Sequence, residues 1–163
     1  MRTALGVGAA ALVCLLVVGG AAAVPADRAL VVSDTETGER LLVTPVEENT
    51  TVALEYTHSV EKTRVLDVYE VRGDRLVTTR MEFESYGWGL PADANVTMTE
   101  NDTFAYNPGG SFEELYVKPG RIAGHRLHVG DRTYDLVERS DARSVHLTVE
   151  RRSALDVALS HLP

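Results

Sequence analysis

Hydrophobic and polar residues alternate with a period of two through the middle of the chain, and this pattern predicts β-strands rather than amphipathic helices. In Thr51–His58, the side chains of Val52, Leu54, Tyr56 and His58 fall on one face, between smaller or more polar residues. Since successive side chains of a strand point to opposite faces, this segment is expected to be a half-buried strand.

The next two segments predict a β-hairpin. Arg64–Val71 and Leu76–Glu84 are rich in β-branched and aromatic residues, and the turn sequence Gly73-Asp74 lies between them. Two such runs separated by a short turn that contains glycine are typical of antiparallel neighbours.

Shorter runs of the same kind lie on both sides of this hairpin, with turn signals about every eight to twelve residues. They are expected to form the strands Ala29–Ser33, Arg40–Val46, Glu114–Val117, Arg126–Val129, Thr133–Glu138 and Ser144–Arg151. Pro45 lacks a backbone N–H, which favours an edge position for its strand. Together the segments predict an all-β fold, an antiparallel sandwich or barrel of about eight strands.

Two segments depart from this pattern. Pro91–Gly110 is expected to be a long loop, a feature that is uncommon in a compact domain and is often functional. Ser153–His161 is expected to form a short C-terminal helix, because Ser153 can cap it and its apolar residues share one helical face.

The N-terminal region has the features of an export signal. Residues 4–24 carry no charge, and Arg2 precedes them. The stretch is long enough to cross a membrane as a hydrophobic helix, with the remainder of the chain outside. Ala21-Ala22-Ala23 equally suits cleavage of a signal peptide.

The domain organisation follows with both fates of this segment left open. Residues 1–25 are a signal peptide or membrane anchor, and residues 26–163 are an extracytoplasmic β domain. The protein is therefore expected at the cell membrane, facing outward, or secreted after cleavage. The membrane is an expected partner through residues 4–24 if the segment is retained. Asn-x-Thr sequons, candidate glycan acceptors in an exported protein, begin at Asn49, Asn95 and Asn101.

Composition narrows the choice of partners. The net charge is −8, and Lys62 and Lys118 are the only lysines of the chain. An acidic surface poor in lysine suits a high-salt cell, and a GC-rich genome is the alternative explanation. The sequence lacks the basic stripe that nucleic acids require. Because the one cysteine, Cys14, lies in the hydrophobic segment, the domain has no cysteine for a zinc site. We expect no metal site and no cofactor.

Two segments carry the candidate chemistry, Tyr56–Thr63 and Glu84–Pro91. The candidate ligand-binding residues in them are Tyr56, His58, Ser59, Glu61, Lys62, Ser85, Tyr86, Gly87, Trp88 and Gly89. His58 and Ser85 both fall on the inward face of their strands, so they are expected to meet near one end of the core. The alternatives are a buried, hydrogen-bonded histidine and a purely structural turn. No catalytic residue is assigned, because His58 and Ser59 face opposite sides of a strand.

The same two segments resemble a known family. Tyr56-x-His58-Ser59-Val60-Glu61-Lys62-Thr63 and Glu84-Ser85-Tyr86-Gly87-Trp88-Gly89-Leu90-Pro91 are similar to the domain-of-unknown-function family 1850 over roughly residues 50 to 140. These are small exported proteins that are often encoded with TAXI-type tripartite (TRAP) transporters.

The resemblance implies a non-catalytic accessory role in the uptake of small carboxylate-type solutes. The transporter permease or the solute-binding protein is then the expected partner. A stand-alone small-ligand-binding module is the alternative, and a cell-surface hydrolase is a weaker one. The protein is not expected to be an enzyme.

Overall fold

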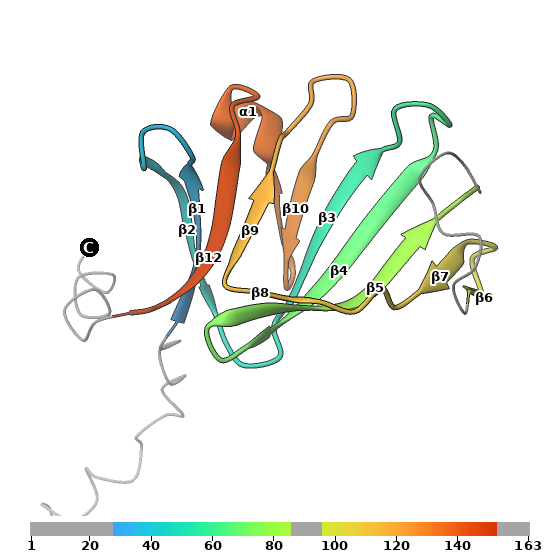
Figure 1. Ribbon diagram of the computed structural model, residues 1–163, viewed down its shortest axis with the longest axis horizontal. Helices are drawn as coiled ribbons and strands as arrows, with labels where there is room; N and C mark the ends of the chain where they lie inside the picture. Colours follow the sequence, from blue (N-terminus) through green and yellow to red (C-terminus); the bar gives the residue numbers. More distant parts are fainter. Residues whose placement is uncertain (1–27, 86–95, 153–163) are drawn as a thin grey trace, which may run out of the picture.

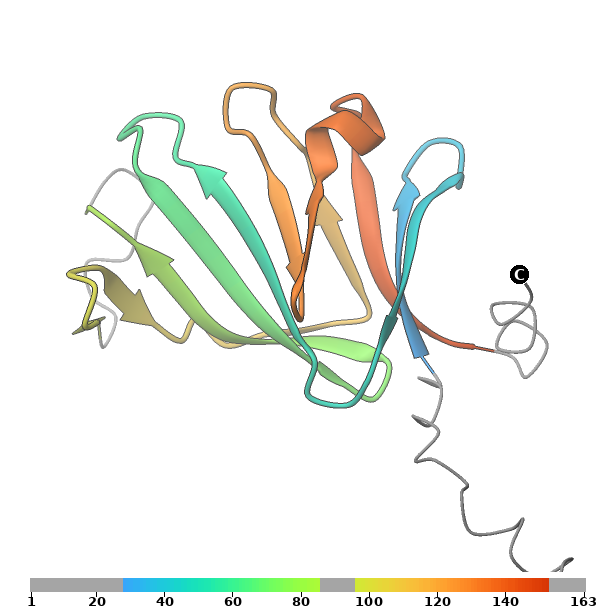
Figure 2. The ribbon, with the colours of Figure 1, turned by 180° about the vertical axis from the view of Figure 1, so that it is seen from behind.

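The computed structural model describes residues 28–85 and 96–152, and the chain in these ranges forms twelve β-strands and one short helix (Figures 1 and 2). The elements are β1 (Arg28–Asp34), β2 (Arg40–Val46), β3 (Thr51–Thr57), β4 (Arg64–Arg72), β5 (Arg75–Phe83), β6 (Thr97–Met98), β7 (Phe104–Tyr106), β8 (Ser111–Phe112), β9 (Glu114–Val117), β10 (Arg126–Val129), β11 (Arg132–Asp135), α1 (Leu136–Ser140) and β12 (Val145–Arg151).

The strands form two antiparallel sheets. The smaller sheet has the order β2-β1-β12-β9, and the larger has the order β11-β10-β3-β4-β5-β7-β6, with β8 also paired to β5. In the smaller sheet β1 pairs with β12, so the first and last strands of the described chain are neighbours. The prediction of an all-β antiparallel fold is confirmed. β2 lies at the edge of its sheet, as Pro45 predicted.

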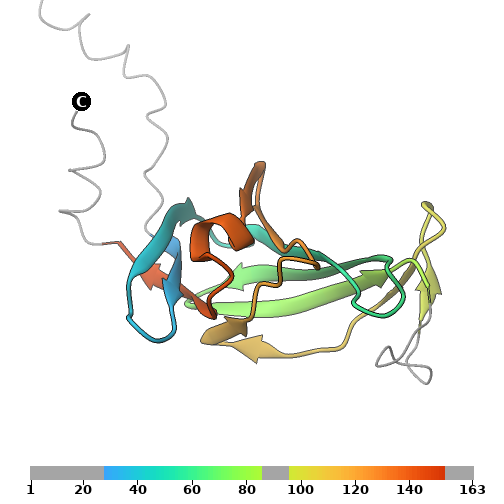
Figure 3. The same cartoon turned by 90° about the horizontal axis from the view of Figure 1, so that it is seen from above.

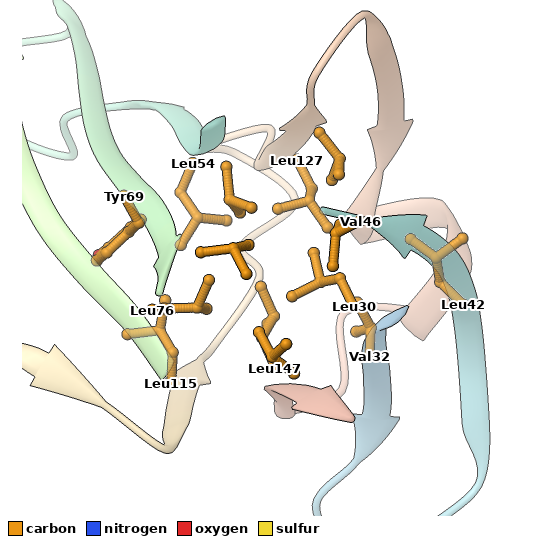
Figure 4. Packing of buried hydrophobic residues seen from close by; sticks show 14 of the residues in the cluster. Leu30, Val32, Leu42, Val46, Leu54, Tyr69, Leu76, Leu115, Leu127 and Leu147 are labelled. Carbon is orange, nitrogen blue, oxygen red and sulfur yellow. The ribbon is translucent and has the colours of Figure 1, made fainter. Parts of the chain in front are cut away.

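The main hydrophobic core lies between the two sheets, where their inward-facing leucines and valines interdigitate (Figure 4). Leu30 of β1 and Leu147 of β12 meet Leu127 of β10 there, and none of the three has any solvent exposure. Full burial of such a side chain contributes about 1.5–3 kcal/mol, so this alternating pattern is the main stabilising feature of the fold.

Side-chain contacts also link the edge strands of the two sheets. Arg132 in β11 donates to the carbonyl oxygen of Pro45 in β2 at 2.6 Å, and the hydroxyls of Thr44 and Tyr134 lie 2.9 Å apart. On the other side, the chain passes from β8 of the larger sheet to β9 of the smaller sheet through Glu113 alone. These links hold the sheets together as a sandwich.

One predicted strand was partly wrong. Instead of a strand over Thr133–Glu138, β11 ends at Asp135 and helix α1 begins at Leu136. The Asp135 carboxylate accepts a hydrogen bond from the backbone N–H of Glu138 at 3.0 Å and caps the helix. The pattern Asp-x-x-Glu is a helix-start signal, and here it overrides the short alternating run.

The predicted loop over Pro91–Gly110 was also partly wrong, because it contains the two short strands β6 and β7, which pair with each other. The predicted helix Ser153–His161 and the hydrophobic segment 4–24 lie outside the described residues. Within the described part of the chain, no helix is long and apolar enough to cross a membrane.

The larger sheet extends well beyond the smaller one. In Figure 3, the β4–β5 hairpin runs away from β1, β2 and β12 toward β7. The residues of β3, β4 and β5 nearest the core belong to the main hydrophobic cluster, whereas Val65 and Phe83 at the far end are buried outside it. This far end carries both of the segments that the sequence singled out.

Candidate functional site

Three neighbouring strands meet at the far end of the larger sheet. β3 ends at Thr57, β4 begins at Arg64, and β5 ends at Phe83. Because neighbouring strands are antiparallel, the end of β3, the start of β4 and the end of β5 lie at the same edge. The first segment therefore forms the β3–β4 turn there, and the second begins at the adjacent end of β5.

His58 stabilises the turn that it opens. Its backbone N–H donates to the carbonyl oxygen of Thr63 at 2.8 Å, and its own carbonyl accepts from the N–H of Lys62 at 3.0 Å. The imidazole Nδ1 accepts a hydrogen bond from the backbone N–H of Glu61 at 3.2 Å. His58 is half-buried, and its contacts fit the structural alternative of a histidine hydrogen-bonded to the backbone.

Ser85 meets this turn from the end of β5. The hydroxyl oxygens of Thr63 and Ser85 are 3.2 Å apart, and the carboxylate of Glu84 accepts from the backbone N–H of Arg64 at 3.4 Å. His58 and Ser85 each contact Thr63, the first through its backbone N–H and the second through its hydroxyl. The two segments are therefore joined by Thr63 and Ser85, whereas a direct contact between His58 and Ser85 stays a prediction.

The other candidate residues are placed as follows. Ser59 and Lys62 are exposed at the turn, and Glu61 is partly exposed. Tyr86, Gly87, Trp88 and Gly89 lie outside the described residues. Among the sequons, Asn49 and Asn101 are exposed, and Asn95 lies outside the described residues.

A carboxylate surrounded by tyrosines occupies the inner face of the same sheet, beside the turn. Asp67 of β4 lies opposite Leu54 on β3 and opposite Met81 on β5. Tyr56 and Tyr106 occupy neighbouring inward positions, since Tyr56 pairs with Val65 and Tyr106 pairs with Met81. Strands far apart in the sequence thus bring these polar groups to one half-buried face.

The groups of this cluster shift one another's pKa values. Burial raises the pKa of Asp67 to about 6, and the hydrogen bond with the Tyr56 hydroxyl lowers it only in part. Burial, followed by the charge of Asp67, also raises the pKa values of Tyr56, Tyr69 and Tyr106. The tyrosines therefore remain neutral hydrogen-bonding groups, whereas Asp67 can change charge in the mildly acidic range.

His125 extends this cluster toward β10. Its ring stacks on Tyr56 with centroids 5.0 Å apart and an angle of 10° between the planes. Its Nδ1 accepts from the backbone N–H of Gly120 at 3.2 Å. Burial lowers the pKa of His125. The ring is thus held mainly as a neutral aromatic surface next to Tyr56.

Asp67 was not among the candidate site residues predicted from the sequence, although the alternation in β4 could have indicated it. Val65, Asp67, Tyr69 and Val71 occupy successive inward positions of β4, so an aspartate interrupts an otherwise apolar or aromatic face. A carboxylate in such a register position is costly to bury and is often functional. Sequence alternation alone could have singled it out, but not the tyrosines that surround it.

This arrangement is suited to binding through hydrogen bonds and aromatic contacts. The phenol hydroxyls can donate or accept, and the ionised carboxylate of Asp67 accepts from an ammonium or hydroxyl group. Within residues 28–85 and 96–152, no group of three or more histidine, cysteine, aspartate or glutamate side chains could hold a metal ion.

A known protein family matches the part of the chain that carries these features. Residues 52–136 match the family described as Domain of unknown function (DUF1850). The matched range begins in β3, ends at the first residue of α1, and includes both converging segments and the Asp67 cluster. No curated protein and no solved structure matches the chain significantly. Because the match covers more than half of the 163 residues, the chain belongs to the DUF1850 family.

Proposed function

We propose that this protein is a non-catalytic accessory protein on the outer side of the membrane, acting beside a TAXI-type tripartite solute transporter. The observation that carries the proposal is the contact between Thr63 and Ser85, which joins the two family-like segments at one end of the larger sheet. The uncharged N-terminal stretch supports an extracytoplasmic location. The transporter context rests on the resemblance of the two segments.

The β3–β4 turn is the proposed contact surface for the transporter. Val60 at this turn is 60% exposed, and Ser59 and Lys62 beside it are also exposed. An exposed apolar side chain within a polar rim is a favourable anchor for a protein partner. The interaction is expected to depend on Val60 more than on the surrounding polar side chains.

Capture from native membranes tests this proposal. The full-length protein, tagged at its C-terminus and extracted in mild detergent, is expected to recover the transporter permease or the solute-binding protein. Val60→Asp should abolish recovery because it places a charge at the anchor. Val43→Asp is the matched control, since Val43 is 52% exposed on the smaller sheet. Failure of the native protein to recover any transporter component, or equal loss in both variants, contradicts the proposal.

A second candidate, a small-ligand-binding module, is favoured by the Asp67 cluster on the inner face. One carboxylate among three tyrosines can bind the ammonium group of an amino acid, with aromatic rings contacting the cation. Calorimetric titration with amino acids and dicarboxylates distinguishes this function. Asp67→Asn should remove binding of the amine-bearing ligands, whereas Asp131→Asn at an exposed turn should not. Absence of binding to every ligand counts against this candidate.

A further inference from the structure

A pocket of about 280 Å³ opens at the far end of the larger sheet, lined mainly by residues of its outer face and also by Tyr56. It lies where β3, β4 and β10 approach the loop before β10. Its lining includes Glu55, Thr57, Arg64, Ile122, Gly124 and Arg126. Two arginines and one carboxylate therefore set its charge.

Arg64 balances the carboxylate. The Nε atom of Arg64 lies 3.0 Å from Oε2 of Glu55, and Nε2 of His128 lies 3.5 Å from the same oxygen. This ion pair uses the inner nitrogen of the Arg64 guanidinium. Within the described residues, the two terminal nitrogens of Arg64 form no hydrogen bond and remain available to a ligand.

Arg126 is the second cation of the pocket. It lies opposite Glu55 in the β10–β3 pairing, and its side chain is exposed. In the described ranges, Arg126 forms neither an ion pair nor a side-chain hydrogen bond, in contrast to Arg64. With Glu55 already paired, the pocket carries an excess positive charge in a chain whose net charge is −8.

One large apolar side chain, Ile122, lies among the mainly polar residues of the pocket. Ile122 is 86% exposed, the largest exposure among the large hydrophobic residues of the described chain. The backbone N–H of Thr57 donates to the carbonyl oxygen of Ala123 at 2.8 Å and holds this loop against β3. A ligand in the pocket would therefore have two guanidinium groups and one aliphatic side chain within reach.

We propose that this pocket binds a small organic carboxylate, with Arg126 and Arg64 holding the carboxylate and Ile122 covering the hydrocarbon part. Guanidinium groups form paired, charge-assisted hydrogen bonds with carboxylates and phosphates. Contact with Ile122 favours a carboxylate with a hydrocarbon chain over phosphate, and the Glu55 carboxylate repels a dianion. The volume is at the small end of ligand pockets, which favours a ligand of few atoms.

Calorimetry on the full-length protein in detergent at low ionic strength tests this site, with acetate, butyrate and inorganic phosphate as probes. Butyrate is expected to bind more tightly than acetate, and both more tightly than phosphate. Arg126→Gln should weaken butyrate binding about tenfold, the effect of losing one charge-assisted contact. Arg80→Gln is the matched control, because Arg80 is an exposed arginine of the same sheet that pairs with Glu82. It should leave butyrate binding unchanged.

A second variant separates the apolar contact from the charge. Ile122→Ser should lower the affinity for butyrate and leave that for acetate unchanged. The inference is overturned if neither carboxylate binds, if phosphate binds more tightly than butyrate, or if Arg126→Gln and Arg80→Gln behave alike. It is independent of the proposed transporter role, because membrane capture tests Val60 on the turn, whereas this titration tests Arg126 on the outer face.

Discussion

The hydroxyl groups of Thr63 and Ser85 lie 3.2 Å apart at the end of the larger sheet, although the two residues are 22 positions apart in the sequence. Thr63 closes the β3–β4 turn by accepting the N–H of His58. Ser85 is the second residue after the end of β5. This contact therefore joins the turn of the first segment to the start of the second.

A double-mutant cycle tests whether this contact couples the two segments. Thr63→Val and Ser85→Ala each remove one hydroxyl, and a part-buried hydrogen bond of this kind contributes about 0.5–1.5 kcal/mol. The free energies of unfolding of the single and double variants are expected to be non-additive by about 0.5–1 kcal/mol. Additive effects measured by urea denaturation would show that the two hydroxyls do not interact.

Asp67 is expected to lower the stability of the protein at neutral pH. Its pKa rises from 3.8 to about 6 on folding, so between these values the folded state binds more protons than the unfolded state. The free energy of unfolding therefore decreases as the pH rises through this window. Asp67→Asn should increase the free energy of unfolding at pH 7 by about 1–3 kcal/mol.

Urea denaturation at several pH values between 4 and 7 measures this effect. The wild-type protein should lose stability from Asp67 as the pH rises, and Asp67→Asn should show a flatter profile. Asp131→Asn serves as the control, because that side chain is 98% exposed. A parallel pH profile for wild type and Asp67→Asn would mean that burial does not perturb this carboxyl group.

Asp34 is expected to stabilise the protein at neutral pH, in contrast to Asp67. Its carboxylate accepts from the backbone N–H groups of Thr37 and Glu36 at 2.9 and 2.8 Å, and these bonds, then Arg143, hold its pKa below 3.8. The stability that it contributes is present above the ordinary pKa and is lost as the pH falls through the folded value.

Asp34→Asn should therefore lower the melting temperature at neutral pH by removing the ion pair with Arg143, in which the Nη1–Oδ2 distance is 2.6 Å. The same variant should lose less stability than wild type on acidification below pH 4. Glu36→Gln is the control in the same turn, because it retains the backbone N–H that Asp34 binds. Thermal melts at pH 7 and pH 3 measure both effects.

Core packing predicts that Leu127 contributes strongly to the free energy of unfolding. This side chain has no solvent exposure and lies between the two sheets. Leu127→Ala should lower the free energy of unfolding by about 2–5 kcal/mol, the usual result of a cavity in a packed core. Ile122→Ala in the preceding loop should change it by less than about 0.5 kcal/mol because Ile122 is exposed. Equal effects in chemical denaturation would contradict the observed core.

Gly110 is expected to resist replacement. Its φ of +119° favours glycine, and a Cβ atom would lie 3.2 Å from the ring of Phe112. Gly110→Ala should lower the free energy of unfolding by about 1–3 kcal/mol. Gly120→Ala is the matched control, since that glycine has an ordinary φ and its nearest contact would be Ala123 at 3.6 Å. Comparable unfolding midpoints for the two variants would refute the conformational argument.

Local patterns determined most of the strands of this protein. Alternation predicted β3, and the turn at Gly73 predicted the β4–β5 hairpin, in which Gly73 has a φ of +64°. Alternation and turn chemistry are properties of neighbouring residues, so they can be identified without knowing the fold. The same local order places the ends of β3 and β5 at one edge, which is why the sequence could bring the two segments together, although not identify Thr63 as the residue that joins them.

Only the tertiary structure determined what surrounds these residues. The pairing of β10 with β3 places His125 on Tyr56 and brings Arg126 close to Arg64, although no local pattern links these strands. The raised pKa of Asp67 likewise depends on burial by side chains from other strands. Desolvation and charge interactions depend on which side chains are close in space, and residues close in space can be far apart in the sequence. The sequence could therefore locate this end of the sheet, but only the packed structure could define its chemistry.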